Sequence, residues 1–167
     1  MASRAEATIE DLYRVTEDGK AEIVDGEVVL IPHTGDLPAS AGGEVFASLR
    51  EFGRRTGLGR AYTDNVGFIV NLPNRRSFSP DAAFYTGPRT GGKFLEGPPV
   101  FAVEIRSKDD CGRKAEHALA QKRADYFAAG TLVVWDVDVL RDSVVRSLPV
   151  NSSRDSSGLR PGRDGGG

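Results

Sequence analysis

The order strand–helix–strand in the last third of the chain most constrains its fold. Residues 100–106 alternate large apolar side chains with Ala, Glu and Arg, as in a β-strand. Residues 113–129 are rich in alanine and are followed by Gly130, which is typical of a helix and its end. Residues 131–137 are nearly all apolar, as in a strand covered on both faces. This order predicts a crossover unit whose two strands are parallel or mixed within a helix-covered sheet, an α/β fold with α+β character.

The earlier part of the chain also alternates between strand-like and helix-like patterns. Asp25-Gly26 between two short apolar runs predicts a β-hairpin, because its tight turn needs positive φ. Residues 40–52 carry apolar side chains at the spacing of one helical stripe. The other expected elements are a helix from Thr8 to about Glu17 with Thr8 as its cap and Asp11 three residues on, strands at 65–72 and 78–85, and a loop at 86–99.

Size and composition indicate one domain. The chain has 167 residues, an apolar fraction of 39% and a net charge of −2, so it can bury a core and has no overall basic character. We expect a single domain over residues 1–150 and a disordered tail over 151–167, where Ser, Arg and Gly leave little to bury. The single cysteine excludes an intramolecular disulfide. The chain lacks a long apolar run and a signal-peptide core, so we expect a cytoplasmic protein.

Three charged side chains lie at positions where an apolar residue or a simple turn would be expected. Glu104 is in the middle of an apolar strand, and Asp81 follows Pro80 at the start of another. Lys122 shares a helical stripe with Tyr126, on the face that should pack against the sheet. A buried carboxylate is unfavourable unless it is paired or binds a metal. Two carboxylates can hold Mg²⁺ while a lysine places a positive charge beside a phosphate.

Each of these residues also has an ordinary structural interpretation. The Lys122 side chain can extend along the apolar face to reach water. Glu104 can form an ion pair with Arg106 or Lys122, and Asp81 can be a turn or edge residue. Three such anomalies in one compact stretch favour a common explanation.

Several arginines are candidates for contacts with a phosphate backbone. Arg54 and Arg55 lie at the end of the second helix, near Arg50 and Arg60, and the turn after residue 72 carries Arg75 and Arg76. A phosphate contact is one interpretation of the helix-end cluster. A solvated face that suits the helix dipole is the other.

The ordered set of these motifs resembles the Uma-two family, bacterial proteins of the PD-(D/E)XK restriction-endonuclease-like superfamily. The resemblance covers residues 8–145 and implies a mixed sheet flanked by helices. It also implies that Asp81 and Glu104 are metal ligands and that Lys122 is the catalytic lysine. The superfamily's usual lysine follows the acid by two residues, where this chain has Arg106, whereas in this family the following helix supplies it. The motifs are Glu22-Ile-Val-Asp25-Gly26-Glu27, Ser79-Pro80-Asp81, Val103-Glu104-Ile-Arg-Ser107, Lys122-Arg-Ala-Asp-Tyr126 and Gly130-Thr-Leu-Val-Val-Trp135-Asp-Val137-Asp138.

These features together suggest a metal-dependent DNA endonuclease that hydrolyses phosphodiester bonds with Mg²⁺ or Mn²⁺. Glu22 could complete the acidic set, although its place in a hairpin strand also suits a surface carboxylate. One alternative is a nuclease-fold protein that binds nucleic acid or a protein partner without hydrolysis. Another is a structural domain in which Asp, Lys and Glu form an ion network. A homodimer is a further expectation, because members of the superfamily often pair to cut two strands.

Overall fold

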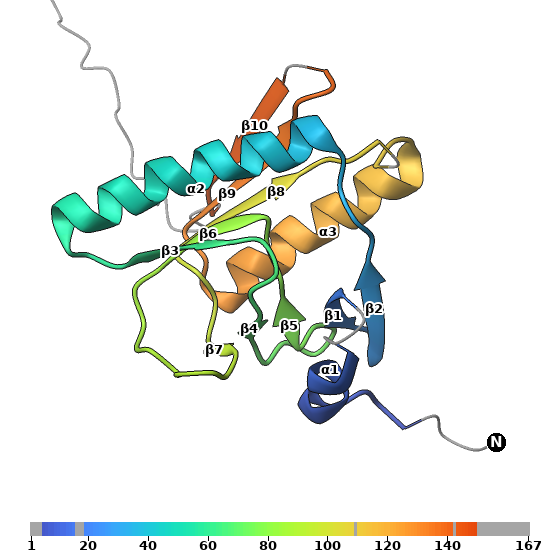
Figure 1. Cartoon of the computed structure of the whole chain (residues 1–167). Coiled ribbons are helices and arrows are strands. Elements are labelled where there is room, and N and C mark those ends of the chain that lie inside the picture. The colour runs from blue at the N-terminus through green and yellow to red at the C-terminus, as the bar shows by residue number, and fades with distance from the viewer. Residues whose placement is uncertain (1–4, 16–18, 109, 142, 150–167) are drawn as a thin grey trace, which may run out of the picture.

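A computed structural model describes residues 5–15, 19–108, 110–141 and 143–149 of the chain (Figure 1). Glu17, the expected end of the first helix, and the tail at 151–167 lie outside the described residues. The single-domain boundary at residue 150 stays a prediction. The helices in the described part are α1 (Ile9–Val15), α2 (Asp36–Thr56) and α3 (Arg113–Ala129).

The largest sheet has five strands in the order β10-β9-β8-β6-β3. Strands β8 and β9 run parallel and are joined by α3, which confirms the predicted crossover. The other neighbouring pairs are antiparallel, so the sheet is mixed, as predicted. The bounds are β3 (Arg60–Thr63), β6 (Ala82–Tyr85), β8 (Phe101–Ile105), β9 (Val133–Asp138) and β10 (Ser143–Ser147).

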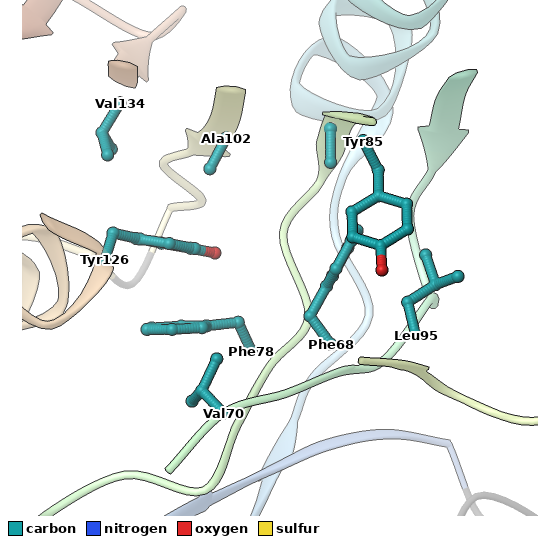
Figure 2. Packing of buried hydrophobic residues seen from close by; sticks show 9 residues of the cluster. Phe68, Val70, Phe78, Tyr85, Leu95, Ala102, Tyr126 and Val134 are labelled. Atoms are coloured by element: carbon teal, nitrogen blue, oxygen red, sulfur yellow. The ribbon is translucent and has the colours of Figure 1, made fainter. Parts of the chain in front are cut away.

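Helices cover both faces of this sheet. Val103 and Ile105 point to the side on which Phe46 and Leu49 of α2 pack. The other face carries α3, and there Tyr126 packs with Ala102, Val134 and Phe78 (Figure 2). The rings of Tyr126 and Phe78 are stacked with centroids 3.9 Å apart. The alternation along β8 therefore sends Glu104, like Ala102, toward α3.

Two small sheets lie beside the main one. Strands β1 (Lys20–Val24) and β2 (Glu27–Ile31) form the predicted hairpin, with Asp25 and Gly26 at φ of 50° and 74°. The other small sheet has the order β5-β4-β7, and its strands are β4 (Phe68–Ile69), β5 (Ser77–Phe78) and β7 (Leu95–Glu96). Leu12 of α1 packs on Ala21 and Ile23, which fixes the hairpin against the rest of the molecule.

Several expected elements have different bounds in the structure. The strand expected at 65–72 is paired only over two residues, since Asn65 has a φ of 68°. The strand expected at 78–85 is interrupted at 79–81, because Pro80 has no N–H to donate to a ladder. The loop expected at 86–99 contains β7, and α2 begins four residues before Ser40.

Among the residues that the structure describes, no helix combines the length and the apolar character needed to span a bilayer.

Candidate functional site

The break before β6 places Asp81 opposite Glu104. Ala82 pairs with Val103 across the antiparallel β6–β8 ladder, so one further step brings Asp81 level with Glu104. The Asp81 N–H donates to the carbonyl oxygen of Val103 at 2.9 Å. In return, the N–H of Ile105 donates to Oδ2 of Asp81 at 2.6 Å. Residues opposite each other on neighbouring strands point to the same face, so both carboxylates face the α3 side of the sheet.

Helix α3 brings Lys122 and Tyr126 to the Glu104 carboxylate. Lys122 Nζ lies 2.9 Å from Oε2 of Glu104, and the Tyr126 hydroxyl donates to Oε1 at 2.6 Å. The two side chains are four residues apart, so they occupy one stripe of the helix. Lys122 therefore packs toward the sheet beside Glu104.

Glu22 of β1 approaches the same lysine from the hairpin. Its Oε1 lies 2.9 Å from Lys122 Nζ and accepts the N–H of Ser79 at 2.8 Å. Its Oε2 accepts from Arg75 at 2.7 Å. Glu22 is 4% exposed, so it is not the surface carboxylate that its hairpin position allowed. Its oxygens hold Lys122 and Arg75 in place.

A second lysine, Lys20, is bound to Asp81. Its Nζ lies 3.0 Å from Asp81 Oδ1 and 2.6 Å from Asp64 Oδ1. Sequence reasoning missed Lys20, because its partners are 44 and 61 residues away and no local pattern marks them. Tyr126 had a visible signal, since it shares the stripe of Lys122, but its bond to Glu104 could not be read from the stripe alone.

The close packing of charges changes the acidity of the groups involved. Burial, together with the neighbouring Asp81 and Glu22 carboxylates, raises the pKa of Glu104 in spite of Lys122. Burial opposes the charge of Lys122, but Glu104 and Glu22 outweigh it and raise the pKa of the lysine. Burial likewise opposes the charge of Glu22, yet Lys122 and Arg75 lower its pKa. Lys122 and Glu22 are therefore held charged, while burial makes the charged form of Glu104 less favourable.

A cavity of about 190 Å³ is lined by Lys20, Glu22, Asp81, Glu104 and Lys122, together with Asp64 and Ser107. Its carboxylates are hard oxygen donors of the kind that Mg²⁺ prefers. The raised pKa of Glu104 reflects first the burial of its carboxylate, and a bound cation would offset that cost. As placed, however, the described Asp, Glu, His and Cys residues form no group of three or more that could share one metal ion. A metal at Asp81 and Glu104 therefore fits chemically, provided that the lysine contacts rearrange.

The other expected site residues lie elsewhere. Arg75 is buried between Glu22 and Asp125, with its guanidinium 2.8 Å from the latter, so it does not face a nucleic acid as expected. Buried carboxylates outcompete solvent for this guanidinium. Arg54, Arg55 and Arg76 are exposed.

Two basic residues that follow Glu104 in the sequence, Arg106 and Lys108, lie outside the cavity lining. Arg106, two residues after the acid, binds Asp136 at 2.7 Å and also Glu116. Lys108 is exposed in the turn that follows. Among the described residues, neither Arg106 nor Lys108 contacts a carboxylate of the cavity.

The fold and site define a class, the restriction-endonuclease-like α/β proteins with an acidic and lysine-bearing pocket beside the central strands. Residues 7–158 match the sequence model of the Uma2 family, described as "Putative restriction endonuclease". The chain belongs to this family. The prediction from the resemblance is thereby confirmed.

The structure is similar to a crystal structure of a putative nuclease belonging to DUF820 from Anabaena variabilis. The TM-score is 0.69 at 16% sequence identity, and the match covers 86% of this chain and 80% of that one. At this identity the likeness supports the fold. No curated protein matches the chain in sequence.

Proposed function

We propose that this protein is a metal-dependent endonuclease that hydrolyses phosphodiester bonds in DNA. The single observation that carries the proposal is the meeting of Asp81, Glu104 and Lys122 in one cavity, from a strand start, a strand centre and a helix. Membership of a family of putative restriction endonucleases supports the class of reaction.

Asp81 and Glu104 would hold the Mg²⁺ or Mn²⁺ ion. The ion supplies a Lewis acid that polarises the phosphoryl oxygen and lowers the pKa of a water molecule. Lys122 stays protonated between Glu104 and Glu22 and can neutralise charge that develops on the phosphate. Glu22 was expected to complete the metal set, but we propose that it acts by fixing Lys122, because its oxygens already accept three donors.

A non-hydrolytic nucleic-acid-binding protein is the second candidate. The observation that favours it is that the three carboxylates at the centre of the cavity already have cationic partners, namely Lys20 for Asp81 and Lys122 for Glu104 and Glu22. Such self-neutralised groups can be an ion network that a metal never enters.

The test compares cleavage by the wild type with cleavage by Lys122→Ala and Lys108→Ala. Supercoiled, linear and single-stranded DNA are incubated with Mg²⁺, Mn²⁺ or EDTA. We expect Lys122→Ala to lower the cleavage rate by about 10²–10³-fold, as for loss of one electrostatic contact to a developing charge. Lys108→Ala, which removes an exposed lysine outside the cavity, should cleave like the wild type.

Calorimetric titration with Mn²⁺ separates the metal step from the lysine step. Lys122→Ala should retain Mn²⁺ binding, whereas Asp81→Asn plus Glu104→Gln should lose it. Because Lys122 pairs with Glu22 and Glu104, Lys122→Arg, which keeps the positive charge, is a second variant. If Lys108→Ala abolishes cleavage and Lys122→Ala does not, the assignment of the lysine is wrong. If the wild type binds DNA but cuts none of the substrates with either cation, the non-hydrolytic function replaces the proposed one.

A further inference from the structure

A second cavity, of about 340 Å³, is lined by four arginines and by no carboxylate. The chain as a whole has a net charge of −2, so this concentration of positive charge is local. The cavity lies between the second half of α2 and strand β3. Its lining is Phe46, Arg50, Gly53, Arg54, Gly59, Arg60, Ala61, Tyr62 and Arg89.

The charges of these arginines are not neutralised by acidic side chains of the described chain. Arg60 donates to neutral groups, the Tyr62 hydroxyl at 3.2 Å and the carbonyl oxygen of Gly87 at 2.6 Å. Arg50, Arg54 and Arg89 are exposed and make no ion pair with any residue that the structure describes. In contrast, Arg75 and Arg106 each bind two carboxylates. This cavity therefore offers guanidinium groups to an anion from outside the chain.

The arginine cavity lies between α2 and β3, and the acidic cavity lies beyond one end of this seam, where β3 leads to Asp64. An intermediate cavity is lined by Gly42 and Gly43 of α2 and by Thr63, Asp64 and Asp81. It shares Asp64 and Asp81 with the acidic cavity. In Figure 1, β3 returns alongside α2 after the helix ends. Basic side chains thus lie at one end of the seam and the carboxylates at the other.

The helix gives the distance between the two ends. A β-carbon added at Gly42 would be 3.8 Å from the carbonyl oxygen of Asp81, so this turn of α2 touches the acidic site. Arg50 and Arg54 are eight and twelve residues further along, which corresponds to about 12 Å and 18 Å at the rise of an α-helix. One DNA strand advances about 3.4 Å per nucleotide along the duplex axis, so this span is roughly four to five nucleotides.

We propose that Arg50, Arg54, Arg60 and Arg89 bind backbone phosphates of a DNA strand several nucleotides from the phosphate held in the acidic cavity. The strand then follows the α2–β3 seam. The choice of DNA rests on the proposed function, because a polyanion that reaches the acidic cavity must present a phosphodiester there. Guanidinium groups suit this role, since they bind phosphate oxygens through paired N–H donors.

The experiment measures the affinity of a labelled 20-base-pair duplex in EDTA at several KCl concentrations, by fluorescence anisotropy. Arg50→Gln plus Arg54→Gln is compared with Arg113→Gln plus Lys114→Gln, which removes two exposed cationic side chains that do not line the cavity. The net charge changes by the same amount in both. We expect the first pair to weaken binding about tenfold or more and to reduce the slope of log K against log salt by about two, as for two lost phosphate contacts. The second pair should have little effect.

The outcomes separate this inference from the proposed hydrolysis. The arginine site would be overturned if both pairs of substitutions weakened DNA binding equally, or if neither pair weakened it. Poly-glutamate is also added as a competitor in place of unlabelled DNA. If it displaces the labelled duplex as strongly as unlabelled DNA does, and only Arg50→Gln plus Arg54→Gln abolishes this competition, the cavity binds an acidic protein partner and the DNA proposal is overturned. If the wild type cuts no DNA but the first pair alone weakens binding, hydrolysis fails and the arginine site stands. Thermal melting of both variants checks that the fold is retained.

Discussion

At the scale of single residues, burial decides what each charged side chain does. Arg75 and Arg76 are neighbours in one turn, yet the first is 5% exposed and bound to two carboxylates, while the second is exposed. The ring of Phe78 also lies under the Arg75 guanidinium, 5.0 Å from it. The local sequence places both arginines in the same turn, and only the tertiary fold makes one of them buried and the other exposed.

Asp125, the second partner of Arg75, should make a pH-dependent contribution to stability. Burial works to raise its pKa, but hydrogen bonds from Arg75, Asn74 and Gln121 prevail and lower it from 3.8. A carboxylate with a lowered pKa stabilises the fold above its unfolded pKa and loses that contribution as pH falls through the folded value. Asp125→Asn should therefore cost about 1–3 kcal/mol at pH 7, and the difference from the wild type should shrink below about pH 4.

Urea unfolding of both proteins between pH 3 and pH 8 measures this difference. Glu44→Gln, a change of the same type at an exposed position, is the matched control and should show almost none. A difference that is constant down to pH 3 would mean that the Asp125 charge does not stabilise the fold.

The candidate site could be predicted from sequence where its residues break a local pattern. Glu104 interrupts an apolar strand and Lys122 interrupts an apolar stripe, so both are visible without a structure. Lys20 could not be found in this way, because it opens a strand after a glycine, where a lysine is unremarkable. Arg89 of the second cavity lies in a polar loop and gives no signal either.

At the scale of elements, the sequence was most informative where propensity and tertiary packing agree. The bounds of α3 match the prediction, since an alanine-rich run ends at a glycine with φ of 112°. The capping pair at the start of α1 is also present, with the Asp11 N–H donating to the Thr8 hydroxyl at 3.2 Å. Short strands such as β4 and β7 were missed or overextended, because their two-residue pairing depends on distant partners.

The β1–β2 hairpin should be sensitive to its turn, because it positions Lys20 and Glu22. Gly26 has positive φ, and an added methyl would lie 3.3 Å from the Glu6 side chain. Gly26→Ala should therefore destabilise the protein by about 1–2 kcal/mol, the cost of an L-residue in this region. Gly43→Ala adds the same methyl within α2, where nothing lies within 4 Å. It should stabilise the protein by up to about 1 kcal/mol, since alanine favours a helix.

Denaturant midpoints of the two glycine variants test this prediction. Equal and small changes would show that the turn tolerates an ordinary residue. Loss of Mn²⁺ binding in Gly26→Ala, at temperatures where the variant is folded, would show that the turn also sets the geometry of the site.

At the scale of the whole molecule, one buried chain of charges joins parts that share few apolar contacts. Glu22 belongs to the hairpin, Arg75 to the segment before β5, and Asp125 to α3. The apolar cluster of the hairpin is shared mainly with α1, and backbone hydrogen bonds from Arg76 to Ile23 and from Asp25 to Asn74 join the hairpin to the segment before β5. The charged chain extends this link to α3, the layer that carries Lys122.

Arg75→Ala should cost about 3–5 kcal/mol, because it leaves two buried carboxylates without their partner. The hairpin should then unfold before the main sheet. The unfolding transition measured by backbone circular dichroism should therefore no longer coincide with the one measured by amide exchange in the hairpin. Arg76→Ala removes the exposed neighbour and should leave stability within about 0.5 kcal/mol. A single cooperative transition with little loss of stability in Arg75→Ala would rule out this linking role.

The homodimer expected from the resemblance stays a prediction, which light scattering can test.

Because Lys122 is positioned by a helix, the protein can tolerate changes in chain length at some places and not at others. The turn at 107–112 precedes α3, so residues added there lengthen a connection without rotating the helix face that meets Glu104. One residue inserted between Lys122 and Tyr126 would instead rotate one of them by about 100°, because the helix has 3.6 residues per turn. A search for proteins with the same site should thus fix the spacing from lysine to tyrosine and leave the gap after the acid free.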